Sequence, residues 1–338
     1  MQYQDGPVRV AHFSRRPGPG LFSMERIFAD VRRHLADDVD VAIVVNRYPS
    51  KGVLGRLRDS WRARRYRREV NHILGDIHYV ASFLPRKGTL ITVHDCVLLE
   101  TRHGLRRWLI WLIWYWWPLR RAEHVVTVSP FTKKALLHWT SYPSERITVI
   151  PPTLGDDFTF VPSRPHGQWR EVLMLGGAPN KNIRRVAEAL AGLPLRLTLI
   201  GTIGEADRAS LVQHSIDHVI RGGLDDAAIV GAYRDTDILL FPSTYEGFGM
   251  PIIEAQATGR PVITSMIEPM QDTAGGAAVF VDPFDVASIR AGVCRLLDEP
   301  EYADAIIAGG LNNAERYRAS TVAASYATLY RRLGGRDA

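Results

Sequence analysis

The sequence is poor in cysteine, and Cys96 and Cys294 are the only two in 338 residues. Two cysteines cannot build a disulfide framework or a cysteine-rich metal site, and such low usage is typical of a reducing cytoplasm. No uninterrupted apolar run approaches the roughly 20 residues of a membrane-spanning helix. The segment Met1–Pro7 lacks the basic and apolar regions of a secretory signal peptide. These absences lead us to expect a cytoplasmic protein.

The composition, with 46% hydrophobic and 23% charged residues, is typical of a soluble globular protein. Its length suits two domains of ordinary size. The net charge of +6 is unevenly distributed: residues 1–160 contain 25 Lys/Arg and 15 Asp/Glu, whereas residues 161–338 contain 17 and 21. The first half therefore has the basic surface, for which a nucleic acid and an anionic membrane surface are the alternative partners.

Short apolar strands alternate with helical patterns, which predicts α/β domains with parallel sheets. Strands are expected at Val8–Phe13, Val39–Val45, Thr89–Val93, Val125–Val128, Ile147–Ile150, Val172–Leu175, Leu195–Ile200, Ile238–Phe241, Val262–Thr264 and Ala278–Val281. Helices are expected at Ser23–Leu35, Asn182–Leu190, Pro251–Thr258 and Ser320–Leu333.

The strand pattern restarts after a proline-rich stretch, residues 151–165. We therefore predict two doubly wound, Rossmann-like domains, residues 1–160 and 161–316, with a ligand cleft between them. Residues 317–338 are predicted to form a helix that packs back on the N-terminal domain.

The most informative segment reads Phe-Pro-Ser-Thr-Tyr-Glu-Gly-Phe-Gly-Met-Pro-Ile-Ile-Glu-Ala and spans residues 241–255. A glycine loop lies between an apolar strand and a helix that Pro251 opens and Gly259 ends. Free N–H groups at such a helix start can hold a phosphate. Glu246 and Glu254 would repel it, so hydroxyls are their expected partners. A sugar nucleotide offers both kinds of group. The alternative is that Glu254 favours the first helical turn and Glu246 is solvated.

A second glycine loop, Gly176-Gly177-Ala178-Pro179-Asn180-Lys181-Asn182, follows the strand at 172–175. There Lys181 is placed to reach a diphosphate and Asn182 to cap the next helix. An ordinary turn with a surface lysine is the alternative.

A third loop contains Gly18 and Gly20, which would let the backbone approach a ligand closely. The dinucleotide fingerprint would need a third glycine where Ser23 stands, and an acidic residue where the next strand ends in Asn46-Arg47. Nicotinamide binding is therefore disfavoured.

With these motifs the chain resembles the GT-B glycosyltransferases, specifically the retaining family 4, from about Val8 to Tyr330. Glu246 and Glu254 reproduce the family's Glu, seven residues, Glu signature around a Glu-Gly-Phe-Gly core. Further similar segments are Gly259-Arg-Pro-Val-Ile, Val128-Ser129, Ile147-Thr-Val-Ile-Pro151, His94-Asp95 and Asn180-Lys181-Asn182. One departure is that Gly176-Gly177-Ala178 lacks the arginine that many members have before the lysine.

The resemblance implies a role for each matching residue. Glu254 would hold the ribose hydroxyls and Glu246 the hydroxyls of the transferred sugar. Lys181 would neutralise the departing diphosphate, and His94 would face the sugar or the acceptor. The sugar and phosphates would be lined by Gly20, Gly176, Gly177, Asn182, Gly247, Phe248, Gly249 and Met250. Of these residues, Glu246, Lys181 and His94 are the candidate catalytic groups.

The resemblance further implies retaining transfer of a hexose, of the mannose or glucose type, from a UDP- or GDP-sugar. The acceptor would be a glycan or a lipid-linked saccharide in surface-polysaccharide or glycolipid synthesis. No metal cofactor is expected, because the cation of the glycine loop, Lys181, would make a metal unnecessary. The alternatives are a sugar-nucleotide epimerase on the same fold and a catalytically silent subunit that binds a sugar nucleotide at the membrane.

Two segments of the first half are both basic and aromatic. Trp108–Arg121 contains five tryptophans and is too short to span a bilayer, while Arg56–Arg68 contains seven arginines. Aromatic rings flanked by arginines are typical of a membrane interface. A core helix beside a solvated basic face and a nucleic-acid surface are the alternatives. We expect peripheral binding to the anionic inner face of the cell membrane, and no nucleic acid.

Overall fold

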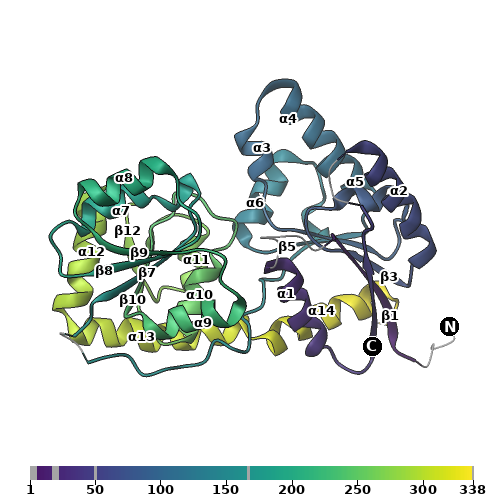
Figure 1. Cartoon of the computed structure of the whole chain (residues 1–338). Coiled ribbons are helices and arrows are strands. Elements are labelled where there is room, and N and C mark those ends of the chain that lie inside the picture. The colour runs from purple at the N-terminus through teal and green to yellow at the C-terminus, as the bar shows by residue number, and fades with distance from the viewer. Residues whose placement is uncertain (1–5, 17–22, 49–51, 166–167, 337–338) are drawn as a thin grey trace. The chain divides into compact units, whose positions relative to one another are not determined.

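The structure is a computed structural model that describes residues 6–16, 23–48, 52–165 and 168–336. The chain forms two compact units (Figure 1). The N-terminal unit comprises Met1–Thr153 and Ala319–Ala338, and the C-terminal unit comprises Leu154–Arg318. Each unit has a six-stranded parallel sheet covered by helices, which confirms the predicted pair of doubly wound, Rossmann-like folds.

The sheet of the N-terminal unit has the strand order β2-β1-β3-β4-β5-β6. Its strands are β1 (Val8–Ser14), β2 (Val39–Val45), β3 (Val70–Ile73), β4 (Thr89–Val93), β5 (His124–Thr127) and β6 (Ile147–Val149). Its helices are α1 (Ser23–Arg33), α2 (Val53–Ala63), η1 (Arg64–Tyr66), η2 (His78–Phe83), α3 (Val97–Thr101), α4 (Gly104–Ile110), η3 (Trp111–Trp116), α5 (Trp117–Arg120), α6 (Pro130–Trp139), η4 (Ser144–Arg146) and α14 (Ala319–Leu333).

The sheet of the C-terminal unit has the order β9-β8-β7-β10-β11-β12. Its strands are β7 (Glu171–Leu175), β8 (Arg196–Ile200), β9 (Asp217–Arg221), β10 (Ile238–Phe241), β11 (Val262–Ser265) and β12 (Val279–Val281). Its helices are η5 (Pro179–Lys181), α7 (Ile183–Leu190), α8 (Glu205–Gln213), α9 (Asp226–Asp235), α10 (Met250–Ala257), α11 (Met270–Ala274), α12 (Val286–Asp298), α13 (Pro300–Ala314) and η6 (Glu315–Tyr317).

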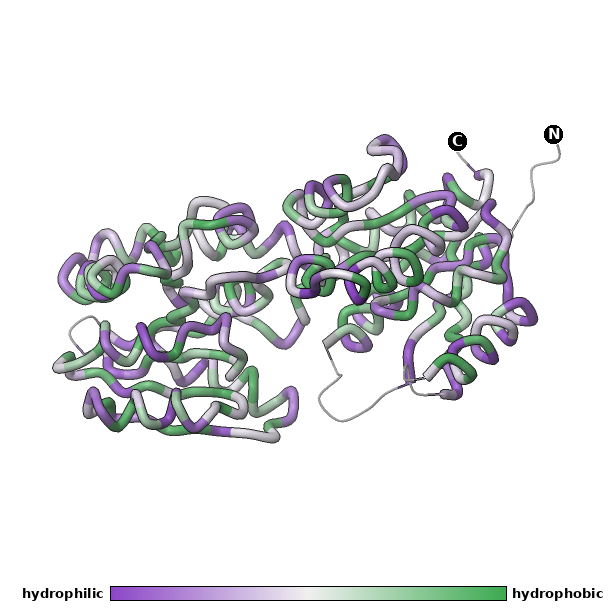
Figure 2. The backbone as a smooth tube through the Cα atoms, turned by 90° about the horizontal axis from the view of Figure 1, so that it is seen from above, coloured by the Kyte–Doolittle hydropathy of each residue, from purple (hydrophilic) through white to green (hydrophobic). Residues whose placement is uncertain are grey.

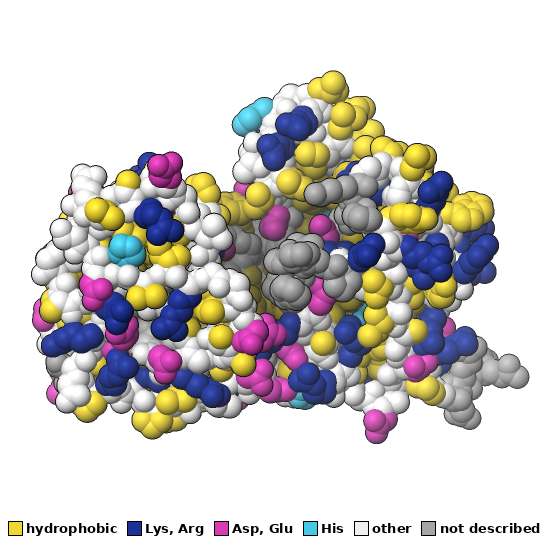
Figure 3. All heavy atoms as spheres, viewed as in Figure 1, with side chains coloured by type: hydrophobic (Ala, Val, Ile, Leu, Met, Phe, Trp, Pro, Cys, Tyr) yellow, Lys and Arg dark blue, Asp and Glu magenta, His cyan; other side chains and the backbone are white. Residues whose placement is uncertain are grey.

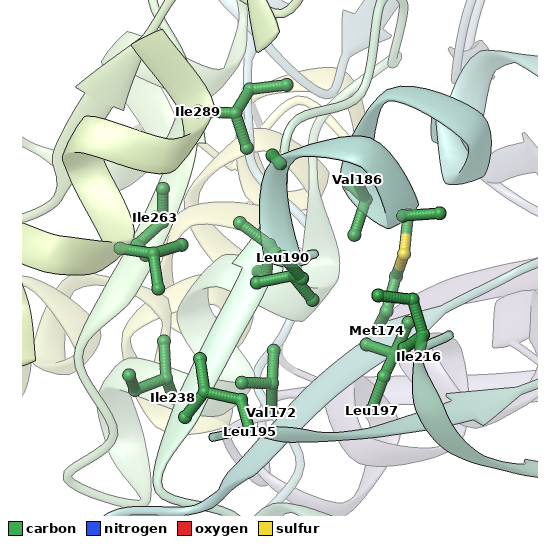
Figure 4. Close-up of a cluster of buried hydrophobic side chains, with 14 of the residues drawn as sticks. Val172, Met174, Val186, Leu190, Leu195, Leu197, Ile216, Ile238, Ile263 and Ile289 are labelled. Atoms are coloured by element: carbon green, nitrogen blue, oxygen red, sulfur yellow. The ribbon is translucent and has the colours of Figure 1, made fainter. Parts of the chain in front are cut away.

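Local sequence accounts for most of these elements. All five residues of β4 are buried, as expected of a parallel strand covered on both faces. Helix α6 begins with Pro130 after Ser129, whose side chain accepts a hydrogen bond from the Thr132 N–H at 3.0 Å. Hydrophobic stretches of the chain run mainly through the middle of each unit (Figure 2). In the C-terminal unit, side chains such as Val172, Val186 and Ile263 form one buried cluster between sheet and helices (Figure 4).

Two strands, β3 and β9, were not predicted. Strand β3 contains Asn71 and His72, which break the apolar pattern. Both side chains are fully buried and hydrogen-bonded, Asn71 to the Arg68 carbonyl at 3.0 Å and His72 to Thr92 Oγ1 at 2.7 Å. Strand β9 is an edge strand with charged residues at both ends, Asp217 and Arg221.

Helix α14, the last in the chain, belongs to the N-terminal unit, where it contacts α1 and β1. Its Tyr330 hydroxyl lies 2.8 Å from His12 Nε2 and 2.7 Å from His72 Nδ1. Arg32 Nη1 can only donate, and it lies 3.4 Å from His12 Nδ1. The proton of His12 is therefore on Nε2, which donates to Tyr330; Tyr330 donates to His72, and His72 to Thr92. This chain requires both histidines to be neutral.

Acid is expected to destabilise the protein through these histidines. Burial, and then the charge of Arg32, lowers the pKa of His12 to about 3. Burial is the main cause that lowers the pKa of His72 well below 6.5, and the proximity of His12 and His94, which would oppose a second positive charge, adds to it. Because both folded-state pKa values lie below the unfolded value, the unfolded chain binds more protons as the pH falls below about 6.5. Each histidine then lowers the free energy of unfolding by about 1.4 kcal/mol per pH unit, until the folded-state pKa is reached.

Urea titrations between pH 7 and 5 measure this slope. His72→Gln is expected to be less stable at pH 7 but to show a shallower slope. His138→Gln, a change at an exposed histidine, is the control and leaves the slope unchanged. Equal slopes for all three proteins would contradict the assignment.

Candidate functional site: the loops after β7 and β10

The strand order of the C-terminal unit reverses its direction between β7 and β10. From β7 the chain proceeds outward to β8 and β9, and then returns to β10 on the other side. The loops that leave the carboxyl ends of two such strands diverge and form the usual ligand crevice of a doubly wound sheet. These loops, residues 176–182 and 242–249, are the two loops of this unit that the sequence singles out.

Hydrogen bonds join the two loops directly. The backbone N–H of Thr244 donates to the Asn180 carbonyl at 2.9 Å. The Asn180 side-chain amide donates to the carbonyl of Tyr245 at 2.7 Å and to Glu246 Oε1 at 3.3 Å. Residues 65 positions apart are therefore held in one site. Asn180 was predicted only as part of the glycine loop and without a role of its own, although its place beside Lys181 was a signal.

Lys181 and Glu246 form an ion pair at the centre of this site. Lys181 Nζ donates to Glu246 Oε1 at 2.6 Å, and both side chains are largely buried, with relative exposures of 17% and 16%. The ammonium also lies 4.6 Å from the centroid of the Phe241 ring. The pair therefore places one positive and one negative group side by side at the carboxyl edge of the sheet.

Glycines make room around this pair. Gly176 has a φ of 87°, and a Cβ there would approach Lys181 Cε to 2.8 Å. A Cβ on Gly177 would overlap the backbone carbonyl of Thr202. Gly249 has a φ of 100° and is the N-cap residue of α10. The backbone at both loops thus adopts positions that a larger residue would not allow.

Asn182 has a different role from the predicted helix cap. It precedes α7 in the left-handed conformation, with a φ of 67°, and its side chain makes no capping hydrogen bond. The side-chain amide instead donates to the carbonyls of Pro242, at 3.1 Å, and Pro283, at 2.6 Å, and the residue is 7% exposed. Asn182 therefore ties the loops after β7, β10 and β12 together.

Glu254 lies on α10 with a buried partner. The Tyr233 hydroxyl donates to Glu254 Oε2 at 2.5 Å. Tyr233 is fully buried, and burial, then the charge of Glu254, raises its pKa well above 10. No pattern in the sequence indicates Tyr233 as a site residue. Helix α10 begins at Met250, so Glu254 lies beyond its first turn, and the interpretation of Glu254 as a first-turn residue is wrong.

The remaining predicted loop residues surround the start of α10. Gly247 follows Glu246, and Met250 is the first helical residue. Phe248 is 8% exposed, its ring packs edge-on against Tyr317 at 5.5 Å, and its carbonyl accepts from Thr273 Oγ1 at 2.6 Å. These contacts fix the backbone from which the first N–H groups of α10 emerge.

In the N-terminal unit, His94 follows the carboxyl end of β4. Burial, and then the charges of His78 and Arg15, lowers its pKa to about 4, so the ring is neutral near pH 7. Its Nε2 atom is buried and has no hydrogen-bond partner among the described residues. The predicted site residue Gly20 lies outside the described residues. Over residues 6–16, 23–48, 52–165 and 168–336, no three His, Cys, Asp or Glu side chains are grouped as a metal site.

The tryptophan segment, Trp108–Arg121, lies in α4, η3 and α5, is helical as far as Arg120, and includes the π-helical stretch η3. Tyr115 and Leu119 are buried, whereas Trp108, Ile113 and Trp117 are exposed by 52%, 43% and 47%. The segment therefore has one side packed in the core of the unit and another side exposed to solvent. No helix in the described parts of the chain has the length and apolar character to cross a membrane.

Comparison with known proteins gives matches to both units. The model of "Glycosyltransferase Family 4" matches residues 8–155, and that of "Glycosyl transferases group 1" matches residues 170–299. O-antigen chain mannosyltransferase B of Escherichia coli is 28% identical over 222 residues, which cover 59% of this chain and 58% of that protein. The MMP alpha-(1->4)-mannosyltransferase of Mycolicibacterium hassiacum is 25% identical over 65% of this chain and 56% of its own. The chain thus spans less than two thirds of the length of these relatives.

Solved structures match nearly the whole chain. Anabaena HepE in complex with UDP and glucose has a TM-score of 0.75 at 15% identity, covering 95% of this chain and 99% of that one. WaaG, a glycosyltransferase involved in lipopolysaccharide biosynthesis, has a TM-score of 0.69 at 16% identity, covering 95% and 99%. These similarities confirm the predicted GT-B fold. The chain belongs to the GT-B glycosyltransferases of the family 4 kind.

Proposed function

We propose that the protein is a retaining glycosyltransferase that moves a hexose, of the mannose or glucose type, from a nucleoside diphosphate sugar to a glycan or lipid-linked saccharide. The observation that carries the proposal is the Lys181–Glu246 ion pair at the switch point of the C-terminal sheet. The names of the relatives, which include two O-antigen chain mannosyltransferases, support the substrate class.

In the proposed complex the diphosphate lies between the two loops. The Lys181 ammonium turns toward the phosphates, and Glu246, released from it, accepts hydrogen bonds from the sugar hydroxyls. The N–H groups at Phe248, Gly249 and Met250 and the positive end of α10 add to the phosphate site. Glu254, held by Tyr233, accepts from the ribose hydroxyls. Gly176 and Gly177 leave the space that the phosphates need.

The chemistry requires stabilisation of opposite charges. As the bond between the sugar and the phosphate breaks, negative charge grows on the diphosphate and positive charge on the ring. A fixed cation and backbone N–H groups stabilise the leaving group without reorganising. Retention follows if the acceptor attacks on the face that the phosphate leaves, with a phosphate oxygen taking the acceptor proton. The neutral His94, with its unpaired Nε2, is proposed to bind a hydroxyl of the sugar or the acceptor.

A panel of nucleotide sugars tests this proposal. A donor at 100 times its Kd stabilises the folded protein by about 2.7 kcal/mol and so raises Tm. UDP- and GDP-linked glucose and mannose are the first compounds to try, and hydrolysis or transfer is then followed with the donor that binds. The proposal fails if none of them shifts Tm. An epimerised nucleotide sugar without transfer would identify an epimerase instead, and binding without any turnover would identify a silent subunit.

We further propose that the N-terminal unit binds an anionic membrane surface. The basic segment Arg56–Arg68 begins within α2, whose Val53, Leu54 and Trp61 are exposed, and continues through η1. Hydrophobic and basic side chains gather over α2 and α4 (Figure 3). Several arginines stack on aromatic rings, for instance Arg64 at 4.6 Å from Trp61. Such a surface combines apolar anchors with charges for lipid headgroups.

Loss of two arginines is expected to weaken vesicle binding. Each basic residue near an anionic surface contributes about 1 kcal/mol, so Arg65→Ala/Arg67→Ala lowers the partition constant roughly 30-fold. The charge-matched control is Arg208→Ala/Arg221→Ala, at exposed positions of the C-terminal unit. Sedimentation with phosphatidylglycerol vesicles measures the effect, and high salt should release the native protein. Equal binding to neutral vesicles would contradict an electrostatic contribution.

A further inference from the structure

The N-terminal unit has a cavity at the edge of its sheet opposite to His94. Its volume is about 680 Å³, within the range of small-molecule sites. Its lining comes from segments that lead into three neighbouring strands: Arg86 precedes β4, Arg120 precedes β5, and Tyr142 precedes β6. The strands are parallel, so these segments meet at the amino edge of the sheet. His94 leaves β4 at the opposite, carboxyl edge, and the cavity is therefore separate from the candidate catalytic residue of this unit.

Aromatic rings form fixed walls of this cavity, to which Trp111, Trp116, Trp139 and Tyr142 contribute. The indole N–H of Trp111 donates to the Trp139 carbonyl at 2.7 Å. The Trp111 and Trp116 rings lie 5.9 Å apart. The Tyr142 hydroxyl donates to the Ala122 carbonyl at 3.4 Å. Rings held in this way offer flat apolar faces at little entropic cost on binding.

Two guanidinium groups line the same cavity. The Arg120 guanidinium lies over the Trp116 ring, 4.1 Å from its centroid, and Arg86 is exposed. No hydrogen bond or ion pair is described for either side chain within residues 52–165. A guanidinium stacked on a ring keeps its N–H edge available, and this edge matches the oxygens of a phosphate.

The charges around the cavity also favour an anion. Arg107 stacks on Trp139 at 5.2 Å, and Arg146 is close enough to act on the titration of Tyr142. The acidic groups nearby are Glu145 and Glu123, and the Glu123 carboxylate already accepts from the Gly88 N–H. The four arginines thus outnumber the two acids.

We propose that this cavity binds a phosphate group attached to a sugar or polyol. Arg86 and Arg120 hold the phosphate oxygens, and the indole rings lie against the C–H groups of the polyol. The phosphate has two possible sources, the headgroup of a membrane lipid or a soluble sugar phosphate. Trp108 and Trp117 are exposed on the same helical segment, and the Trp117 ring lies 6.5 Å from the Trp116 ring of the cavity, so apolar surface continues outward from the cavity, as a lipid headgroup would require. The proposal does not depend on the transfer reaction.

The test uses the full chain with ¹⁵N-labelled tryptophan. Glycerol 1-phosphate is titrated while the indole N–H signals are followed by NMR, and the Trp111 signal is assigned with Trp111→Phe. We expect the Trp111 signal to shift with glycerol 1-phosphate and not with glycerol. Arg86→Ala/Arg120→Ala should weaken binding at least tenfold, whereas Arg65→Ala/Arg67→Ala, with the same loss of charge, should leave it unchanged. Unchanged Tm values show that the variants are folded.

Vesicles distinguish the two sources. If Arg86→Ala/Arg120→Ala also lowers binding to phosphatidylglycerol vesicles more than Arg65→Ala/Arg67→Ala does, the phosphate is that of a lipid headgroup. If vesicle binding responds equally to both pairs, the site serves a soluble sugar phosphate. The proposal is overturned if the Trp111 signal does not move, or if both pairs weaken glycerol 1-phosphate binding to the same extent.

Discussion

Replacing Lys181 with alanine is expected to lower kcat at saturating donor by 100- to 1,000-fold. The ammonium lies at the carboxyl edge of the C-terminal sheet, 2.6 Å from Glu246, within a loop that glycines keep open. Gly176-Gly177-Ala178 contains no arginine, so Lys181 is the cation of this loop. Removing one fixed donor from a developing anion typically costs about 2.7–4 kcal/mol of transition-state stabilisation. Steady-state rates with the donor found in the nucleotide-sugar panel measure the loss.

Arg184→Ala is the matched control for this change. Arg184 is a nearby cation on α7, but it is exposed and pairs with Asp207 at 3.1 Å rather than facing Glu246. Its loss should leave kcat within about twofold. An unchanged kcat in the Lys181→Ala protein, or an equal drop in both variants, would remove Lys181 from the mechanism. A raised KM with normal kcat would mean that the lysine binds ground state and transition state alike.

The sequence could place the candidate site because its chemistry is local. Strands β7 and β10 are each followed at once by a glycine loop and the start of a helix. This local pattern predicts a phosphate-binding site without any knowledge of the rest of the fold. The alternation of strands then puts both loops at carboxyl ends. Strand β10 was predicted with both ends correct, because its four residues are apolar and all buried.

The sequence could not supply contacts that depend on tertiary structure. Strand β3 was missed because His72 and Asn71 look like loop residues until partners such as Tyr330 are known. Asn182 fits a capping position, and only the fold shows its side chain turned to two carbonyls in other loops. Tyr233 lies on α9, 21 residues before Glu254 in the sequence, and no local pattern connects the two residues.

The role of Glu254 leads to the second large effect. Glu254→Ala is expected to raise the Kd of the nucleoside diphosphate, UDP or GDP as the panel indicates, by 10- to 100-fold. A hydrogen bond to a charged group contributes about 1.5–3 kcal/mol, and each 1.4 kcal/mol is a factor of ten in Kd. Isothermal titration calorimetry measures both proteins. Tyr233→Phe is the control, because it removes the partner hydroxyl but keeps the carboxylate.

The two variants separate binding from structure. If Glu254 only satisfied the buried Tyr233, both changes would lower Tm and neither would alter nucleotide affinity. If Glu254 holds the ribose, a 2′,3′-dideoxynucleoside diphosphate should bind the native protein about as weakly as the ordinary nucleotide binds Glu254→Ala. The Glu254→Ala protein should then bind the dideoxy nucleotide almost as tightly as it binds the ordinary nucleotide. The reason is that the losses of affinity from removing the two partners of one interaction do not add. Fully additive losses would show that the carboxylate and the ribose hydroxyls act apart, and the assignment of Glu254 would be wrong.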